Sequence, residues 1–410
     1  MRVAVGQFGA PTAVLNASLF GVLDSLSKAG AEVYGILGGA WGLSQGNVHP
    51  LSFARPPEWL LHTPGAALGA GRQLSFAAHA GEAVQNLRER HVDALIVMGG
   101  NGTMALGQIV ERESQARGYD LQVIGIPKTI DNDIAGVDHT PGYPSAAQFV
   151  LKALCDLAID LEAMVGFEQV RVVEVMGRRT GWLAAAAALY DDLFREVRGS
   201  SADHAGGWDV NRLSRRRVRP IVCLPERPFH LDQVLGDVQR RVREDGCTMV
   251  VVSEGVQPAD GQVMFQTDHG QDKARPFMWG GVGAWLAEAI RDQTKFGVRY
   301  ENLGLLQRCW SRFSVPLDVA EAVRVGREGA HKVLAGESGQ MVGLVRSRQS
   351  EYHVDTVGIQ LSEVAGKERV MTEDEAKLGP TFRDWLRPLL DWSMLCPHPR
   401  LTMSGMTIGE

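Results

Sequence analysis

Cysteine is scarce in this sequence, and its spacing builds neither a disulfide framework nor a metal site. The 410 residues contain five cysteines, none of which forms a CxxC pair, and the number is odd. Scattered cysteines in a chain of this size are typical of reduced thiols in an intracellular protein. We therefore expect free thiols at Cys155, Cys223, Cys247, Cys309 and Cys396.

Long apolar runs and a leader segment are lacking as well. The longest apolar run extends from Trp182 to Leu189, whereas a membrane-spanning helix needs about 20 apolar residues. The first residues enter an apolar stretch and a glycine turn, without the charged, apolar and cleavage regions of a signal peptide. We expect a cytoplasmic protein without a membrane partner.

The chain also lacks an excess of positive charge. Its formal net charge is −6, whereas a general nucleic-acid binder neutralises phosphates with a basic face. The basic run Arg215-Arg216-Arg217 is interpreted as a solvated surface. We therefore expect no nucleic-acid partner, although a local anion pocket remains compatible with this charge.

The sequence does contain a repeated pattern of short β-branched runs, turns and helical stretches. Alternation of this kind is typical of βαβ units with a mostly parallel sheet and helices on both faces. Strands are expected at Arg2–Val5, Ala94–Met98, Leu121–Ile126, Val170–Val175, Pro220–Leu224, Thr248–Val252 and Leu303–Leu306. Helices are expected at Asn16–Ser27, from about Thr103, after Arg178, at Gln233–Glu244 behind an Asp232 cap, and at Val315–Leu334.

This pattern predicts an α/β fold with two similar lobes. The first lobe is expected at residues 1–190 and the second at residues 221–360, joined by an inserted loop or flap at 191–220. Residues 361–410 are expected to form a C-terminal extension that packs back on the lobes. Ligands of such sheets bind at the carboxyl ends of the strands.

A glycine-rich turn at one expected strand end is a candidate phosphate cradle. Gly99-Gly100-Asn101-Gly102-Thr103 follows a strand and opens a helix, and free N–H groups at a helix N-terminus favour an anion. A rival interpretation is the dinucleotide pattern GxGxxA at 100–105, but the acidic residue that should follow the next strand is missing, since Asp120 precedes it. A tight turn without a ligand is the third possibility, and no GxxxxGK[ST] sequence is present.

A second strand end carries charged residues suited to phosphoryl transfer. Lys128, Asp131 and Asp133 lie in the loop 127–133. Phosphoryl transfer needs a carboxylate that positions or deprotonates the attacking hydroxyl, and cations that neutralise the transferred group. A surface loop with aspartates as turn formers is the alternative. Arginines that follow glycine turns or accompany strands add possible phosphate ligands at Arg72, Arg178, Arg299 and Arg308.

These segments together resemble the 6-phosphofructokinases, and especially their bacterial pyrophosphate-dependent branch (diphosphate–fructose-6-phosphate 1-phosphotransferases). The resemblance extends from Val3 to about Arg346. Its motifs are Pro-Lys-Thr-Ile-Asp-Asn-Asp at 127–133, Glu-Val-Met-Gly-Arg at 174–178, Pro-Glu-Arg-Pro-Phe at 225–229, Leu-Gln-Arg at 306–308 and the opening segment 9–19.

The resemblance implies a role for each matching residue. Asp131 is implied as the general base, with Lys128 and Thr129 as further catalytic residues. The implied phosphoryl-donor contacts are Gly9, Arg72, Gly100, Asn101, Gly102 and Thr103. The implied sugar-phosphate contacts are Met176, Gly177, Arg178, Glu226, Arg299 and Arg308, one arginine reaching in from a neighbouring subunit. Asp133 and, more weakly, Asn101 are implied Mg²⁺ ligands, and a homodimer or homotetramer is implied.

Several positions depart from the family pattern. Asn101, Ala10, Leu305 and Gln169 stand where the family carries Asp, Gly, His or Tyr, and Arg, although Arg171 lies close to the last of these. Lys128 resembles the pyrophosphate-dependent branch, whereas Gly102 resembles ATP users, because the pyrophosphate enzymes usually carry Asp there.

The resulting expectation is a glycolytic phosphotransferase that moves a phosphoryl group from pyrophosphate to the 1-hydroxyl of fructose 6-phosphate. Alternatives are ATP as phosphoryl donor, a seven-carbon ketose phosphate as acceptor, and a catalytically impaired regulatory or sugar-phosphate-binding paralogue. A dinucleotide oxidoreductase is a more distant alternative.

Overall fold

The computed structural model describes residues 1–52, 55–71, 73, 75–193, 218–257, 281–347 and 351–395. Contacts divide the chain into two compact units. Unit 1 comprises Met1–Ala146, Arg308–Val370 and Pro388–Leu390, and unit 2 comprises Ala147–Gln307, Met371–Arg387 and Asp391–Glu410. Most of the expected insertion, with the basic run at 215–217, lies outside the described residues, as do Arg72, Cys396 and the last part of the expected extension.

Unit 1 is built on a mixed sheet whose strand order is β11-β10-β5-β4-β1-β2-β3. Its inner strands are parallel, and only the outer pairs β2–β3 and β10–β11 are antiparallel. The strands are β1 Arg2–Gln7, β2 Glu32–Ile36, β3 Val48–Leu51, β4 Ala94–Gly99, β5 Gln122–Pro127, β10 Gln340–Arg346 and β11 Val354–Gln360. The helices are α1 Leu15–Lys28, α2 Gly39–Ser44, α3 Ala80–Glu89, α4 Asn101–Ala116, α11 Pro316–Leu334 and α12 Leu361–Val364, with short 3₁₀ turns at Glu58–Leu61, Phe76–His79 and Ser311–Phe313.

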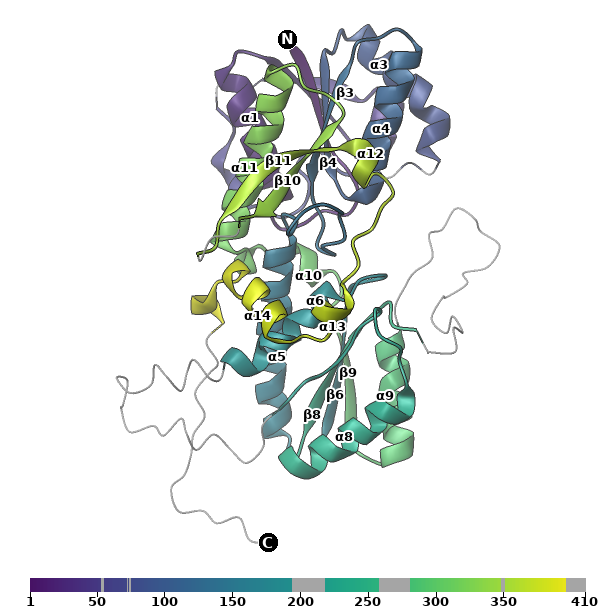
Figure 1. Ribbon diagram of the computed structural model, residues 1–410, viewed down its shortest axis with the longest axis vertical. Coiled ribbons are helices and arrows are strands. Elements are labelled where there is room, and N and C mark those ends of the chain that lie inside the picture. The colour runs from purple at the N-terminus through teal and green to yellow at the C-terminus, as the bar shows by residue number, and fades with distance from the viewer. Residues whose placement is uncertain are drawn as a thin grey trace. The chain divides into compact units, whose positions relative to one another are not determined.

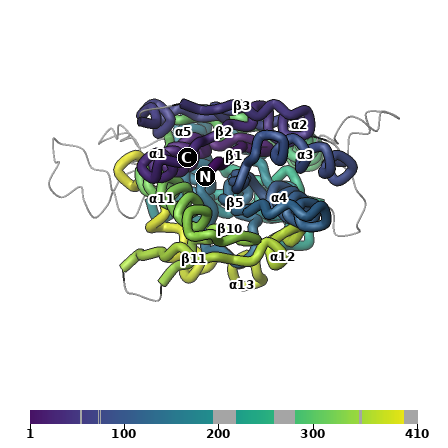
Figure 2. The backbone as a smooth tube through the Cα atoms, turned by 90° about the horizontal axis from the view of Figure 1, so that it is seen from above, coloured from purple at the N-terminus to yellow at the C-terminus, as the bar shows by residue number. Residues whose placement is uncertain are grey.

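Both faces of this sheet are covered, which explains why its central strands are apolar throughout. Val3 and Val5 of β1 face a cluster that includes α1 and α11, whereas Ala4 faces a cluster that includes α3 and α4. Figures 1 and 2 show α1 and α11 on the opposite side of the strands from α3 and α4. Strands buried on both faces read as continuous hydrophobic runs rather than as alternating ones.

Helices α1 and α11 pack backbone to backbone although their sequences lie far apart. A Cβ atom added to Gly21 of α1 would stand 2.1 Å from the Val323 carbonyl oxygen of α11. A Cβ atom on Gly326 of α11 would stand 2.1 Å from the Ser18 carbonyl oxygen of α1. Glycine at both positions therefore permits the close approach that ties residues 308–370 to the N-terminal part of unit 1.

Unit 2 contains a parallel sheet with the strand order β7-β8-β6-β9. Its strands are β6 Val170–Val175, β7 Ile221–Cys223, β8 Thr248–Ser253 and β9 Val298–Asn302. Helices α8 Leu231–Asp245 and α9 Val282–Thr294 cover one face (Figure 1), and α6 Trp182–Ala185 contacts β8. The unit also contains α13 Glu373–Ala376, α14 Pro380–Leu386 and 3₁₀ turns at Ala186–Leu189 and Trp392–Met394, while α5 Tyr143–Ala163, α10 Leu306–Cys309 and the turn Arg387–Leu389 run across the limits of the units.

The predicted α/β fold is confirmed, but two local predictions are wrong. The strand expected at Leu303–Leu306 is absent: β9 lies earlier, at Val298–Asn302, and Leu306 begins the short helix α10. Gly304 has a φ of +52° and Leu305 is exposed, so this apolar stretch is a turn rather than a core strand. The N-cap of α8 is His230, and Asp232 lies inside the first helical turn without capping it.

The units differ from the sequential ranges expected from the sequence. Residues 308–370 join unit 1 rather than the second half of the chain, because β10 pairs with β5 and α11 packs on α1. Phosphoryl-donor binding by residues 1–190 and sugar-phosphate binding by residues 221–360 remain predictions.

Candidate active site

Two of the expected phosphoryl-donor loops and the loop with the expected catalytic residues lie at one edge of the unit 1 sheet. Strands β1, β4 and β5 are neighbours, and Gln7 pairs with Met98 while Gly99 pairs with Pro127. The carboxyl ends of parallel strands in this register reach the same edge of the sheet. The loop at Gly9, the turn at Gly99–Thr103 and the loop from Lys128 therefore begin side by side.

Lys128 connects two of these loops through its side chain. The residue is 3% exposed, its Nζ donates to the carbonyl oxygen of Ala10, and its backbone N–H donates to the Gly99 oxygen at 2.9 Å. Its Nζ would lie 3.8 Å from a Cβ atom added to Gly9. A buried ammonium group thus lies within reach of an anion bound at the loop that follows β1.

The turn at Gly99–Thr103 presents the N-terminus of a long helix. Gly100 is the N-cap of α4, and the N–H groups of Thr103 and Met104 donate to its carbonyl oxygen at 2.8 and 3.1 Å. The positive end of a helix dipole favours an anion at this place. A Cβ atom on Gly102 would meet nothing within 4 Å, so the space beside the second helical residue is open.

Asn101 and Asp133 form the pair that the sequence suggested as metal ligands. The Asn101 Nδ2 donates to the carbonyl oxygen and to Oδ2 of Asp133, at 2.9 and 3.0 Å. The Oδ1 atoms of both residues are buried and have no hydrogen-bond partner among the described residues. Two such oxygens fit a hard cation such as Mg²⁺, which binds proteins through one or two oxygen ligands and keeps several waters.

Electrostatics of Asp133 are consistent with a site that attracts a cation. Burial raises the pKa of the Asp133 carboxyl, and the nearby Glu368 raises it further, while hydrogen bonds from the backbone, Thr129 and Asn101 lower it. An aspartate in place of Asn101 could not donate to Asp133 and would add a like charge. The Asn101 amide therefore binds Asp133 directly through hydrogen bonds. Among the described residues, no group of three or more His, Cys, Asp or Glu is arranged to hold a metal ion.

Residues of the loop 127–133 and of the segment that follows it hold the backbone around Asp131. The N–H of Asp131 donates to Thr129 Oγ1 at 3.0 Å, and Asn132 adopts a left-handed φ of +52° with its side chain buried. The Oδ1 of Asn132 accepts the N–H of Thr140 at 3.1 Å. Sequence reasoning missed Asn132 and Thr140 as supports of this loop, although asparagine tolerates a left-handed turn better than most residues.

In unit 2, the loop after β6 has the expected tight turn. Gly177 has a φ of +137°, and an added Cβ atom would lie 2.4 Å from the Thr180 oxygen and 2.6 Å from Ser253 Oγ. The N–H of Met176 donates to Gln307 Oε1 at 3.0 Å. Glycine is thus required for this turn, which the sequence motif placed correctly.

Two carboxylates support this loop, one of which sequence reasoning missed. Glu226 accepts the N–H of Gly181 at 2.9 Å, and burial raises its pKa, while backbone hydrogen bonds lower it and Glu375 raises it. Glu254 belongs to none of the sequence motifs, yet its Oε1 lies 3.8 Å from Arg178 Nε. Burial raises the pKa of Glu254 as well, and the charge of Arg178 opposes this shift.

The two further arginines occupy different places in the fold. Arg308 lies in α10, and Arg299 lies in β9, paired with Arg171 of β6. Because the Met176–Arg178 loop begins after Val175, Arg299 lies about 13 Å further back along the strand direction. Arg299 is half-exposed, with Nε 3.4 Å from Glu168 Oε2, so unit 2 of one chain does not bring Arg299 to its own Met176–Arg178 loop.

Arg171 and Gln169, in and beside β6, both have structural contacts. Arg171 is 1% exposed and binds Glu168 and Asp160, with the closest contacts at 2.8 and 2.6 Å. Gln169 Oε1 accepts the N–H of Gly297 at 2.7 Å. Arg171 is therefore a structural ion-pair residue and cannot replace the arginine that the family carries at position 169.

Among the described helices, none is both long and apolar enough to cross a membrane. Arg72, the remaining expected phosphoryl-donor contact, lies outside the described residues.

Comparison with known proteins points to one protein family. The family model described as "Phosphofructokinase" matches residues 2–193. The chain is 36% identical over 408 residues to a protein of Alkalicoccus urumqiensis named "Sulfofructose kinase", covering 99% of both chains. It is 32% identical over 415 residues to "Pyrophosphate--fructose 6-phosphate 1-phosphotransferase" of Rhodospirillum rubrum, covering 96% of this chain and 95% of that one.

A solved structure of a phosphofructokinase matches almost the whole length of this chain. The pyrophosphate-dependent phosphofructokinase from Marinobacter aquaeolei is 25% identical, with a TM-score of 0.77 and coverage of 99% of this chain and 95% of that one. The predicted resemblance is thereby confirmed: this chain belongs to the phosphofructokinase family and is a phosphotransferase.

Proposed function

We propose that this chain transfers a phosphoryl group to the 1-hydroxyl of a fructose that carries an anionic group at C6. The observation that carries this proposal is that one loop, directly after β5, carries both the buried amine of Lys128 and, three residues later, Asp131, whose N–H donates to Thr129 Oγ1. A carboxylate base beside a fixed cation is the minimum that in-line phosphoryl transfer requires of the protein.

Sulfofructose is the first candidate acceptor. The full-length relative in Alkalicoccus urumqiensis carries this substrate in its name. Leu305 stands where the resemblance implies a His or Tyr that contacts the 6-phosphate, and a leucine side chain donates no hydrogen bond. A sulfonate carries one negative charge, whereas a phosphate ester carries about 1.5 to 2 near neutral pH. A site with one donor fewer suits the less charged group.

Fructose 6-phosphate is the second candidate acceptor. It is the acceptor in the name of the Rhodospirillum rubrum relative, and it was the expectation from the sequence. A seven-carbon ketose phosphate is the remaining alternative that Leu305 allows.

Pyrophosphate is the proposed phosphoryl donor, and ATP is the alternative. Lys128, whose Nζ reaches the loop after β1, supports pyrophosphate, as do the names of several relatives. The open space beside Gly102 supports ATP, because nothing there would crowd a nucleotide.

The proposed chemistry uses few groups of the chain. Asp131 accepts the proton of the 1-hydroxyl as that oxygen attacks the transferred phosphorus, and the bond from this phosphorus to the bridging oxygen breaks, so that phosphate leaves from pyrophosphate or ADP from ATP. Lys128 and the N-terminus of α4 stabilise the negative charge of the transferred group. Asp133 and Asn101 would hold Mg²⁺, which supplies further neutralisation of phosphate charge when bound. The separation of Arg299 from Met176–Arg178 within one chain supports a homo-oligomer in which a neighbouring subunit completes the sugar site.

A steady-state assay tests this function directly. Pyrophosphate and ATP are each combined with sulfofructose, fructose 6-phosphate and sedoheptulose 7-phosphate, at several Mg²⁺ concentrations. We expect the highest kcat/KM for sulfofructose, because specificity is a ratio of these values. Asp131→Asn, which keeps the size of the side chain, should lower kcat by about 10²- to 10⁴-fold.

Each outcome has a distinct meaning. A higher kcat/KM for fructose 6-phosphate would replace sulfofructose by the second candidate. No turnover of any acceptor with either phosphoryl donor would contradict the proposed function and favour a regulatory paralogue. Equal activity of Asp131→Asn and the native chain would remove Asp131 as the base.

A further inference from the structure

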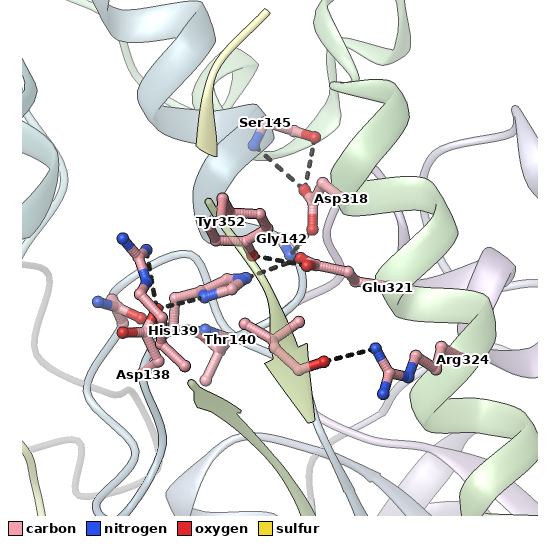
Figure 3. Close-up of polar contacts among 12 residues, drawn as sticks. Asp138, His139, Thr140, Gly142, Ser145, Asp318, Glu321, Arg324 and Tyr352 are labelled. Carbon is pink, nitrogen blue, oxygen red and sulfur yellow. Dashed lines mark hydrogen bonds and ion pairs between the residues drawn. The ribbon is translucent and has the colours of Figure 1, made fainter. Parts of the chain in front are cut away.

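His139 occupies a fully buried position between two carboxylates, in the segment that follows the loop 127–133. Its Nδ1 lies 2.9 Å from Asp138 Oδ2, and its Nε2 lies 2.8 Å from Glu321 Oε2 of helix α11. The imidazole side chain is 0% exposed. Figure 3 shows the ring lying between the two carboxylates, one from its own loop and one from the helix.

This geometry requires a charged imidazole. A neutral ring donates from one nitrogen only, so the other lone pair would face a carboxylate oxygen. Burial by itself lowers the pKa of His139, but hydrogen bonds and charges from Asp138 and Glu321 outweigh it and raise the pKa to about 9. The imidazolium is therefore the state that fits both contacts at neutral pH.

Further charged or titratable groups lie around the ring, among them Arg369, which donates to the Asp138 carbonyl oxygen. Arg346 of β10 donates to Asp138 Oδ2 at 3.1 Å, and Tyr352 donates to Glu321 Oε1 at 2.6 Å. Arg346 also lies over the Tyr352 ring, 4.8 Å from its centroid. Asp318 lies one turn before Glu321 on α11, and burial raises its pKa to about 6, although hydrogen bonds from Ser145 and Gly142 oppose this shift.

The residue after His139 supports the loop that carries Asp131. Thr140 Oγ1 donates to the Thr129 carbonyl oxygen at 3.1 Å, and its N–H donates to Asn132 Oδ1 at 3.1 Å. Thr129 and Asn132 flank Asp131 on both sides. A displacement of Thr140 would therefore move both supports of Asp131 together.

Helix α11 holds the same stretch of chain at a second point. Asp318 accepts the N–H groups of Gly142 and Ser145 at 2.9 and 3.1 Å, and the Ser145 hydroxyl at 2.5 Å. Residues three apart on a helix share one face, so Asp318 and Glu321 contact neighbouring parts of the loop end. Figure 3 shows both carboxylates reaching from α11 toward this stretch.

We propose that His139 is a positioning residue for phosphoryl transfer: as an imidazolium held between Asp138 and Glu321, it fixes Thr140 and thereby the place of Asp131. The proposal rests on the proposed role of Asp131 as the base. It assigns to residues beyond the 127–133 motif a role in setting kcat, rather than in binding either substrate.

The proposal predicts a pH dependence with a defined sign. A histidine whose pKa is raised on folding stabilises the folded state fully below its unfolded value of about 6.5. That contribution is lost as pH rises through about 9. We expect kcat of the native chain to fall on the alkaline side near this pH, because the neutral ring releases one carboxylate and loosens Thr140.

Replacement of His139 tests the role. His139→Gln should lower kcat about 10- to 100-fold, while the KM values for the phosphoryl donor and for the acceptor each change less than about threefold. The reason is that a small misplacement of a catalytic group lowers the rate rather than the binding of substrates. The alkaline decline of kcat should disappear in this variant. His331→Gln is the matched control, since His331 lies on the same helix with a largely exposed side chain, and its kinetics should equal those of the native chain.

A second variant keeps the proposal testable whatever the stability of the first. Glu321→Gln preserves volume and removes one of the two charges beside the ring, so the alkaline decline should move to lower pH. If His139→Gln shows no cooperative melting, Glu321→Gln decides alone. An unchanged alkaline decline in Glu321→Gln, or native kcat in a folded His139→Gln, overturns the positioning role.

Hydrogen exchange separates this proposal from the proposed function. Without substrates, the backbone amide hydrogens of Asp131 and Thr140 should exchange at least about tenfold faster in His139→Gln than in the native chain. Their exchange rates should be unchanged in His331→Gln. If the native chain turns over no acceptor, the proposed function fails, while the exchange rates still report whether His139 holds the loop. Unchanged exchange in a folded His139→Gln would overturn the proposal independently of activity.

Discussion

At the scale of single residues, Gly102 allows a direct test of the phosphoryl donor. It is the second residue of α4, and an added side chain meets no atom within 4 Å. Gly102→Asp should fold normally, because an acidic residue in a first helical turn stabilises by about 0.3–1 kcal/mol. If ATP is used at all, its kcat/KM should fall at least about tenfold, whereas the value for pyrophosphate should stay within about twofold.

Gly102→Ala is the control for this experiment, since it adds a Cβ atom without charge or reach. Steady-state kinetics with both phosphoryl donors and a thermal melt provide the measurements. Equal losses with pyrophosphate and ATP would show that this position does not discriminate between them.

The sequence predicted site residues best where neighbours in the chain are also neighbours in space. Lys128, Asp131 and Gly177 stand in short motifs directly after strands, so their places in the fold were predictable, and register alone brings the loops after β1, β4 and β5 to one edge. Partners that arrive from distant segments had no sequence signal. Glu254 beside Arg178 and Glu321 beside His139 belong to this group, because their roles depend on tertiary contacts that no local pattern records.

At the scale of elements, the contact between α1 and α11 predicts an unusual sensitivity to a small substitution. Gly21→Ala would place a methyl group against the α11 backbone, and overpacking of this kind costs about 1–3 kcal/mol. We expect the cost to exceed the gain of about 1 kcal/mol in helix propensity. The midpoint of thermal unfolding should fall by several degrees.

Gly236→Ala is the matched control, because Gly236 lies in α8 with nothing within 4 Å of an added Cβ atom. This variant should gain about 0.5–1 kcal/mol from helix propensity alone. A stabilised Gly21→Ala would show that α1 and α11 do not approach as closely as described.

Element boundaries followed from the sequence where burial and periodicity agree. The central strands of both sheets are buried along almost their whole length, and β1, β4, β6 and β8 were located within one or two residues. The prediction failed at Leu303–Leu306, where the apolar residues are exposed. An exposed apolar turn and a short core strand have the same composition, and only tertiary context distinguishes them.

At the scale of the whole molecule, the discontinuity of unit 1 predicts how fragments behave. The matched family region ends at residue 193, yet the sheet of unit 1 is completed by β10 and supported by α11. A fragment of residues 1–193 would leave the β5 edge and the apolar face of α1 uncovered. We expect it to show no cooperative thermal transition.

Co-expression with a fragment of residues 308–370 provides the control, since this segment carries the missing strands and helix. Circular dichroism on heating should show a cooperative transition only for the fragments together. Cooperative melting of residues 1–193 alone would contradict the assignment of residues 308–370 to unit 1.

The pairing of β5 with β10 also fixes an order of events during synthesis. Residue 127 leaves the ribosome long before residue 340, and at about 5–20 residues per second the delay is roughly 10 to 40 seconds. During this interval the nascent N-terminal sheet presents an unpaired edge, which is a template for association with other chains. Every described strand of unit 2 emerges before that edge is closed, so we expect the growing chain to need protection of this edge until residue 346 has left the ribosome.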